Sequence, residues 1–144
     1  MMREAIIEAK KAENIGEVPV GAIIVKNREI IARGHNLMIG TNDPTAHAEI
    51  VAIRETGRFL GNYRMVDTEI FVSLEPCLMC YSAIAHARIS KIYFGAFDKK
   101  SGMCISCLKS LNSLNLNHVP AMVGGILESD CSNIMKNFFK ERRN

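Results

Sequence analysis

The sequence lacks long apolar segments. No apolar run reaches the roughly 18 residues that a membrane-spanning helix needs. Residues 1–13 alternate charged and apolar side chains, and they contain no continuous apolar segment typical of a secretory signal peptide. Both absences argue against a membrane-spanning or exported protein, so we expect a cytoplasmic protein with no membrane partner.

Internal repeats, low-complexity tracts and linkers rich in proline or glycine are also missing. The chain has 144 residues, the usual size of one domain, and we expect a single domain over residues 1–144. Hydrophobic residues make up 48% and charged residues 23% of the sequence, which is typical of a globular protein. The net charge of +3 is too small to predict an anionic partner by itself.

The cysteine content argues against a disulfide framework. The chain has five cysteines, an odd number, and no export signal. This combination favours metal binding or free thiols.

Hydrophobic periodicity predicts an alternation of helices and strands. Amphipathic spacing and proline in a first turn predict helices over residues 2–14, from Asp43-Pro44 to about Thr56, from Glu75-Pro76 to about Arg88, and over Asp130–Arg143. Segments rich in β-branched residues predict strands at Val20–Val25, Ile30–Ala32, Thr68–Leu74, Ile92–Phe97 and Ala121–Leu127, the first two joined as a hairpin. Alternating elements of this kind predict a layered α/β domain around a sheet of about five strands.

Two short motifs at predicted helix starts combine metal ligands with a carboxylate. His47 and Glu49 form an H-x-E motif, and Pro76, Cys77 and Cys80 form a P-C-x-x-C motif. Cysteines three residues apart share one helix face, and the positive end of a helix favours their thiolate forms. One imidazole and two thiolates leave the fourth position of a tetrahedral zinc open, as in catalytic zinc sites.

Glu49 is the candidate acid–base group of such a site. Two thiolates donate more charge than neutral imidazoles, so a zinc held here acidifies water less than a site of three histidines does. A nearby base is then needed, and Glu49 would take a proton from the water and deliver it to the substrate. A glutamate in an HAE motif is usually only solvated, and a lone CxxC is often redox-active or structural. The two motifs together, about thirty residues apart, are far more specific.

The sequence also offers an alternative metal site that shares Cys77 and Cys80. Cys104 and Cys107 form another C-x2-C pair, separated from the first by 23 residues. Four thiolates would make a closed structural zinc site. This alternative leaves His47 and Glu49 without a role, so we favour Cys104 and Cys107 as packing or loop thiols.

The paired motifs are the signature of zinc-dependent nucleobase deaminases, and longer segments narrow the resemblance. These segments are Glu17–Ala22, Asn36, Asp43–Ile50, Leu74–Cys80, Phe94–Asp98, Leu116–His118 and Phe138–Arg143. In order along nearly the whole chain, they resemble the bacterial tRNA-specific adenosine deaminases, which convert wobble adenosine to inosine. Residues 103–107 depart from the glycine-rich character of that family.

The resemblance implies a three-layer α/β/α cytidine-deaminase-like fold with a central mixed sheet. It also implies a homodimer that holds a tRNA anticodon stem-loop, and one Zn²⁺ per subunit on His47, Cys77 and Cys80. Glu49 corresponds to the family's proton shuttle and Asn36 to a residue that lines its base pocket. Asp98 corresponds to a contact with the RNA backbone, where an acceptor favours a ribose 2′-OH and so RNA over DNA.

The C-terminal segment combines aromatic and basic residues. Phe139 would stack on splayed loop bases, and Arg142 and Arg143 would pair with phosphates. The alternative is an ordinary helix that buries its phenylalanines and exposes its arginines.

Three functions remain open at this point. The first is hydrolytic deamination of the wobble adenosine in the anticodon loop of an arginine tRNA with an ACG anticodon, where the target base is single-stranded. The second is a free-base or nucleoside deaminase of the same fold, acting on guanine or cytosine. The third is a non-catalytic zinc module that binds RNA.

Overall fold

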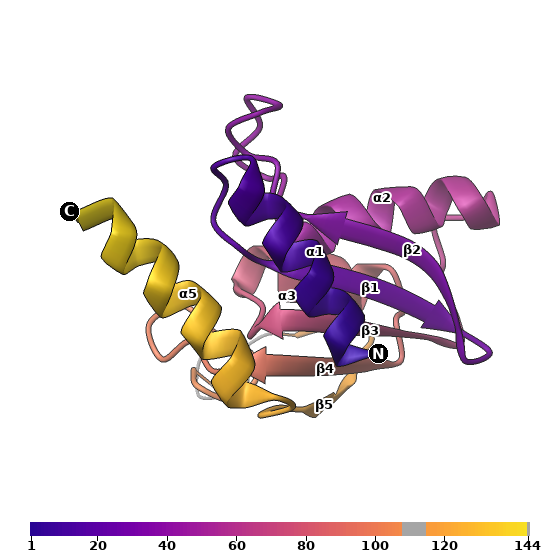
Figure 1. The fold of residues 1–144 in the computed structure, drawn as a ribbon. Coiled ribbons are helices and arrows are strands. Elements are labelled where there is room, and N and C mark those ends of the chain that lie inside the picture. The colour runs from indigo at the N-terminus through magenta and orange to yellow at the C-terminus, as the bar shows by residue number, and fades with distance from the viewer. Residues whose placement is uncertain (108–114, 144) are drawn as a thin grey trace.

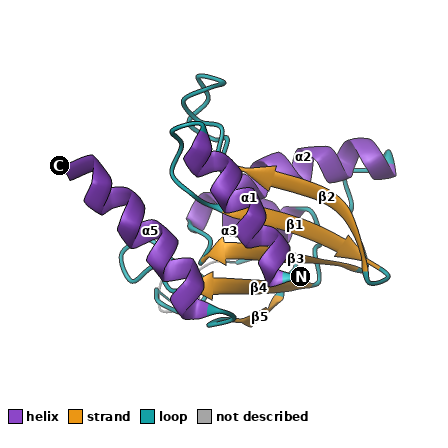
Figure 2. Ribbon diagram, in the orientation of Figure 1, coloured by secondary structure: helices purple, strands orange, loops and turns teal. Residues whose placement is uncertain are grey.

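A computed structural model describes residues 1–107 and 115–143. Helices lie on both faces of a central sheet, which gives three layers (Figures 1 and 2). The helices are α1 (Met2–Asn14), α2 (Ala48–Leu60), α3 (Leu78–His86) and α5 (Glu128–Arg143). The strands are β1 (Gly21–Lys26), β2 (Glu29–His35), β3 (Thr68–Leu74), β4 (Lys91–Ala96) and β5 (Ala121–Val123). No helix among these residues is long and apolar enough to cross a membrane.

The sheet is mixed, with strand order β2-β1-β3-β4-β5. β1 pairs antiparallel with both β2 and β3, whereas β3, β4 and β5 run parallel to one another. The expected three-layer α/β/α fold with five strands is therefore confirmed.

Strand alternation assigns the helices to two faces. A Cβ atom on Gly21 would lie 2.0 Å from the carbonyl oxygen of Ala5 in α1, and one on Gly34 would lie 2.5 Å from that of Ala48 in α2. Gly21 and the partner of Gly34 are neighbours in β1, so they point to opposite faces. Cys131 of α5 packs on Gly95, on the same face as α1, where α1 and α5 lie in front of the sheet in Figure 1. Helices α2 and α3 cover the other face.

Two helices begin later than the sequence predicts. α2 begins at Ala48 rather than at Asp43-Pro44, because the Asp43 carboxylate accepts hydrogen bonds from the Thr45 amide and hydroxyl and closes a local turn. α3 begins at Leu78 rather than at Glu75-Pro76. Strand β5 ends at Val123, four residues before the predicted end, since Gly125 adopts a positive φ of 85° and turns the chain.

The topology gathers several chain segments at one edge of the sheet. β3 and β4 end there, β1 begins there, and β2 leads there into Asn36. The starts of α2 and α3 follow at the same edge. In sheets with parallel strands, this edge is where ligands bind.

Candidate zinc centre

Three metal-ligating side chains converge at the starts of α2 and α3. His47 and Cys77 are the N-cap residues of the two helices, and Cys80 follows in the first turn of α3. The Nδ1 atom of His47 lies 3.7 Å from Sγ of Cys77 and 3.4 Å from Sγ of Cys80. The three ligand atoms lie within 4.8 Å of one another. The fold therefore brings the two motifs together, so that their three ligand atoms can reach one metal ion.

The electrostatics of the two cysteines fit a divalent cation. A hydrogen bond from Cys80, helped by one from His47, lowers the pKa of Cys77 to about 4. The Cys77 thiolate and burial in turn raise the pKa of Cys80. Two thiols and one imidazole therefore compete for protons in one small volume, and a dication that replaces those protons lets both sulfurs ionise. The nitrogen and sulfur donors suit zinc.

Glu49 lies buried beside this cluster. It is in the first turn of α2, two residues after His47, and only 4% of its surface is exposed. Burial raises the pKa of its carboxyl to about 7, and the charge of His47 offsets only part of this effect. A carboxyl with a pKa near neutrality both accepts and releases protons readily at working pH.

The alternative site of four thiolates is wrong for the described residues. Cys104 is fully buried in the main hydrophobic core, and the Sγ atom of Cys107 is 3.9 Å from the carbonyl oxygen of Lys99. Neither joins the cluster of His47, Cys77 and Cys80 in the part of the chain that the structure describes.

Asn36 lies next to the cluster, at the end of β2. It is almost fully buried, and its Oδ1 atom accepts a hydrogen bond of 2.8 Å from the amide of Ala48, the first residue of α2. The amide donor fixes the orientation of the side chain, so the Nδ2 amine is the group that Asn36 can offer to a ligand.

The other predicted substrate residues lie on two surface elements. Asp98 follows β4, and its Oδ1 atom accepts hydrogen bonds from the amides of Lys100 and Ser101. Phe139 and Arg143 line a hollow on α5, together with Lys136 and Lys140.

Arg142 contacts other residues of the chain. Its Nη2 atom donates a hydrogen bond of 2.9 Å to the carbonyl of Gly16, and its guanidinium lies 4.2 Å from the ring centroid of Phe138. Phe138 is buried and Phe139 is exposed, so the C-terminal aromatic pair is divided between the core and the surface.

Glu75, near the cluster, was not predicted as a functional residue from the sequence. The buried carboxylate of Glu75, two residues before Cys77, accepts hydrogen bonds from Asp98, Ile105 and Ser106. The only signal in the sequence is a charged residue at the end of an apolar strand, which by itself predicts a solvated turn.

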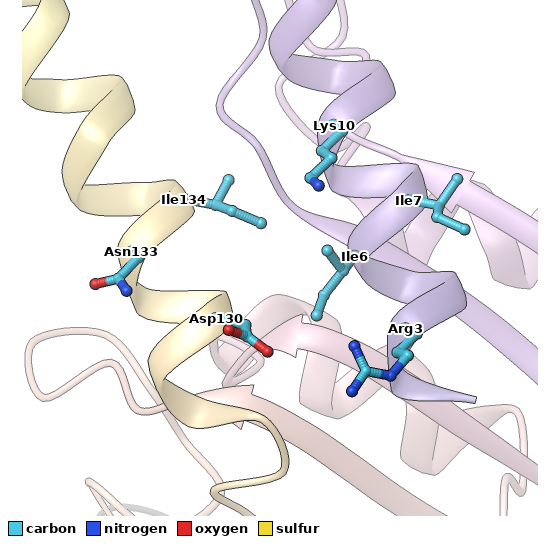
Figure 3. Close-up of a pocket in the computed structure, with 7 residues that line it drawn as sticks. All are labelled: Arg3, Ile6, Ile7, Lys10, Asp130, Asn133 and Ile134. Carbon is cyan, nitrogen blue, oxygen red and sulfur yellow. The ribbon is translucent and has the colours of Figure 1, made fainter.

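A separate cavity of about 490 Å³ lies between α1 and α5 (Figure 3). Its lining residues are Arg3, Ile6, Ile7, Lys10, Asp130, Asn133 and Ile134. None of these belongs to the cluster at the starts of α2 and α3, so this cavity is not the metal site.

Comparison with known proteins first defines the class. The family model for the cytidine and deoxycytidylate deaminase zinc-binding region matches residues 1–96. This match covers both motifs and agrees with the geometry of the cluster. The chain is an enzyme of the zinc-dependent deaminase class.

Full-length relatives narrow this assignment. The chain is 49% identical over 143 residues to the tRNA-specific adenosine deaminase of Buchnera aphidicola, covering 99% of this chain and 88% of that protein. It is 45% identical over 142 residues to the enzyme of the same name from Bacillus subtilis, with coverage of 99% and 88%. The chain belongs to the family of tRNA-specific adenosine deaminases.

Solved structures agree with this family. A structure from work on A-to-I editing by tRNA:A34 deaminases superposes with a TM-score of 0.89 at 40% identity, covering 92% of this chain and 96% of that one. A guanine deaminase from Bacillus subtilis gives a TM-score of 0.65 at 29% identity, covering 99% and 92%.

Proposed function

We propose that this enzyme deaminates the wobble adenosine in the anticodon loop of a tRNA to inosine, with the arginine tRNA that carries an ACG anticodon as substrate. The observation that carries this proposal is the cluster of His47, Cys77 and Cys80 with Glu49 buried beside it. The cluster sits in a chain that is 49% identical to a tRNA-specific adenosine deaminase.

The chemistry follows from the residues of the cluster. His47, Cys77 and Cys80 would hold one zinc, which, when bound, supplies a Lewis acid that makes a water molecule nucleophilic at neutral pH. The water oxygen forms a bond to C6 of adenine, and the bond from C6 to the amino nitrogen breaks. Glu49 takes one proton from the water and delivers it to N1. It then takes the second proton from the new hydroxyl on C6 and delivers it to the amino nitrogen, which leaves as ammonia.

Asn36 supplies a reason for purine recognition. Its Oδ1 atom is held by the Ala48 amide, so its Nδ2 amine donates a hydrogen bond to a ligand. A ring nitrogen of a purine accepts such a bond. The hydrogen bond from the Ala48 amide ties Asn36 to the start of α2, one residue from His47. This one contact would therefore position both the group that binds the base and the metal ligand.

The outer contacts follow the chemistry of a single-stranded RNA loop. Phe139 is exposed in a hollow lined by Lys136, Lys140 and Arg143, where a base would stack while phosphates pair with the basic side chains. Arg142 would add charge through the N–H groups that Gly16 does not occupy. Asp98 would accept a hydrogen bond from a ribose 2′-OH.

The unit that we propose to act is a homodimer of chains that each fold as one deaminase domain over residues 1–144. We place it in the cytoplasm, where tRNA is its partner and neither DNA nor a membrane is involved. Sedimentation of the zinc-loaded protein with and without an anticodon stem-loop tests the dimer and the number of RNA molecules bound.

The activity itself is tested by measuring inosine at the wobble position of an arginine tRNA transcript with an ACG anticodon. Free adenosine, cytosine and guanine are assayed in parallel. Glu49→Gln is the inactive variant, and Glu55→Gln is its control because it makes the same change on the exposed face of the same helix.

Inosine on the tRNA alone, lost in Glu49→Gln and kept in Glu55→Gln, is the expected result. Ammonia released from free guanine without inosine on tRNA would move the enzyme to the free-base branch, to which the Bacillus subtilis guanine deaminase belongs. RNA binding without turnover on any substrate would leave a binding module.

A further inference from the structure

The carboxylate of Glu75 is enclosed by the loop that follows β4. Glu75 is 2% exposed, yet it lies at the end of β3 directly before Pro76 and Cys77. Its Oε1 atom accepts hydrogen bonds from the Asp98 amide at 3.0 Å and the Ser106 hydroxyl at 2.5 Å. Its Oε2 atom accepts bonds from the amides of Ile105 and Ser106 at 2.7 and 2.8 Å. One carboxylate thus holds both ends of residues 98–106.

Backbone contacts complete this attachment. The amide of Glu75 donates to the carbonyl of Ala96, and the amide of Met103 donates to the carbonyl of Pro76. A Cβ atom on Gly102 would lie 2.4 Å from the Glu75 carboxyl carbon, so the loop approaches the carboxylate as closely as glycine allows. The loop is therefore fitted to this side chain.

The charge of Glu75 is balanced by the loop and not by a cation. Among the described residues, no lysine, arginine or histidine forms an ion pair with Glu75. Three backbone amides and one hydroxyl surround the carboxylate instead. Because charged acceptors make stronger hydrogen bonds than neutral ones, the loop loses much of its attachment if the charge is removed.

The 98–106 loop carries side chains that suit contact with RNA. Asp98 begins it, Lys99 and Lys100 are exposed within it, and Phe97 precedes it with 36% of its surface exposed. The loop leaves β4 at the edge of the sheet where β3 leads into Cys77. It therefore presents two positive charges and an acceptor beside the predicted catalytic centre.

We propose that Glu75 is a positioning residue that fixes the 98–106 loop on the start of α3 and so sets the affinity of the enzyme for the anticodon stem-loop. It touches neither the substrate nor the metal in this role. The proposal rests on the proposed function for its substrate, and on the hydrogen bonds of Glu75 for its mechanism.

Glu75→Gln is the main test. Glutamine keeps the shape of the side chain but carries no charge. Its amide NH2 group would also face a backbone N–H, so that two donors would meet. We expect the KM for the anticodon stem-loop to rise about tenfold with kcat changed less than about threefold, since the loop must then be ordered at the moment of binding. Zinc stays at one per chain. Glu69→Gln, at the other end of the same strand, is the control and leaves KM unchanged.

Amide hydrogen exchange reads the attachment without any activity. In Glu75→Gln, the amides of Asp98, Ile105 and Ser106 should exchange at least about tenfold faster, because their acceptor is weakened. The same amides in Glu69→Gln keep the protection of the unaltered protein. Protection that stays the same in Glu75→Gln overturns the proposal whatever the kinetics show.

Gly102→Ala tests the same attachment by a change in the loop instead of in Glu75. Its Cβ atom would meet the Glu75 carboxylate and the carbonyl oxygen of Asp98, at 2.4 and 2.5 Å. If both single changes act by releasing the loop, the double variant raises KM no more than the larger single change does. Effects that multiply would mean that the two residues act separately, which contradicts the proposal.

The remaining outcomes separate this role from the proposed function. Stem-loop turnover by the unaltered protein with an unchanged KM in Glu75→Gln overturns the role alone. A lower kcat with zinc lost and KM unchanged also overturns it, because Glu75 would then serve the metal ligands. If the unaltered protein does not turn over the stem-loop, the proposed function fails, and this role in affinity fails with it.

Discussion

Two buried glutamates each lie two residues from a metal ligand, and their pKa values are shifted in opposite directions. Glu49 lies two residues after His47, Glu75 lies two residues before Cys77, and both are less than 5% exposed. Burial dominates at Glu49 and raises its pKa to about 7. Burial also acts at Glu75, but hydrogen bonds from Ser106, Ile105 and Asp98 outweigh it and lower the pKa.

The difference shows how one residue type serves two purposes at one edge of a sheet. A buried carboxyl with few hydrogen-bond donors around it has a raised pKa, so it gains and loses a proton near neutral pH. This property suits acid–base chemistry. A carboxylate surrounded by donors stays charged and holds its donors in place. Desolvation prevails at Glu49, which lies deeper among its neighbours, whereas the hydrogen bonds to Glu75 outweigh its desolvation.

The largest predicted effect is the loss of zinc and activity when a cysteine of the cluster beside Glu49 is replaced, compared with a cysteine of the 98–106 loop. Cys80 lies in the cluster beside Glu49, whereas Cys104 lies in the 98–106 loop that encloses Glu75, and both are fully buried. Cys80→Ala should lose zinc and all measurable activity, while Cys104→Ala should keep one zinc per chain. Metal analysis and inosine assays on both variants test this. Zinc lost in Cys104→Ala as well would restore the site of four thiolates.

The second prediction separates catalysis from stability at Glu49. Glu49→Gln should lower kcat by about 10²- to 10⁴-fold, the usual contribution of a general acid–base group. The thermal midpoint of the zinc-loaded protein should stay the same or rise, because a buried charge with few donors is removed. Steady-state kinetics and calorimetry, with Glu55→Gln as the control, measure both. A midpoint that falls would mean that Glu49 is also a structural anchor.

The third prediction makes the same substitution at the other glutamate. Glu75→Gln should lower the free energy of unfolding by about 1–3 kcal/mol, since several charged hydrogen bonds are weakened in a buried place. Urea unfolding of the Glu49 and Glu75 variants side by side shows whether the two changes differ in sign. Equal shifts in both proteins would remove the contrast between the two sites.

The predictable part of the site is the part that residue types define locally. The H-x-E and P-C-x-x-C motifs together predict a metal site without knowledge of the fold, so His47, Cys77 and Cys80 could be proposed as ligands from the sequence. Spacing alone does not suffice, because Cys104 and Cys107 have the same spacing and lie outside the cluster. The strand Thr68–Leu74 was also predicted with its observed bounds. The segment is seven residues long and contains β-branched and aromatic residues, and this length and composition favour a strand over a helix.

The contacts that escaped prediction depend on distant backbone groups. Glu75 binds amides that lie 23 to 31 residues further along the chain. Every residue type except proline carries such an amide, so no sequence pattern marks the partners. The start of α2 was placed too early for a related reason. The helix was predicted to begin at Asp43-Pro44, but the Asp43 carboxylate closes a turn with Thr45, and His47 is the N-cap.

The smallest predicted effect comes from a third buried glutamate, which is balanced by cations. Glu8 of α1 is 2% exposed and contacts Lys11 at 2.8 Å and His35 at 3.0 Å, with Arg33 at 3.7 Å. Burial opposes its charge, but the hydrogen bonds from Lys11 and His35 prevail and lower its pKa below the usual 4.5.

The pH dependence of this group has a definite sign. Because the folded pKa is the lower one, the unfolded chain binds more protons below about pH 4.5, and the stability from Glu8 is lost as the pH falls through the folded pKa. Glu8→Gln should therefore cost about 1 kcal/mol near neutral pH and progressively less in acid. Urea unfolding across this range measures the difference, and Glu4→Gln, which breaks the exposed pair with Arg33, should cost about 0.5 kcal/mol or less. A cost at Glu8 that does not shrink in acid would show that shape, and not charge, gives this residue its place.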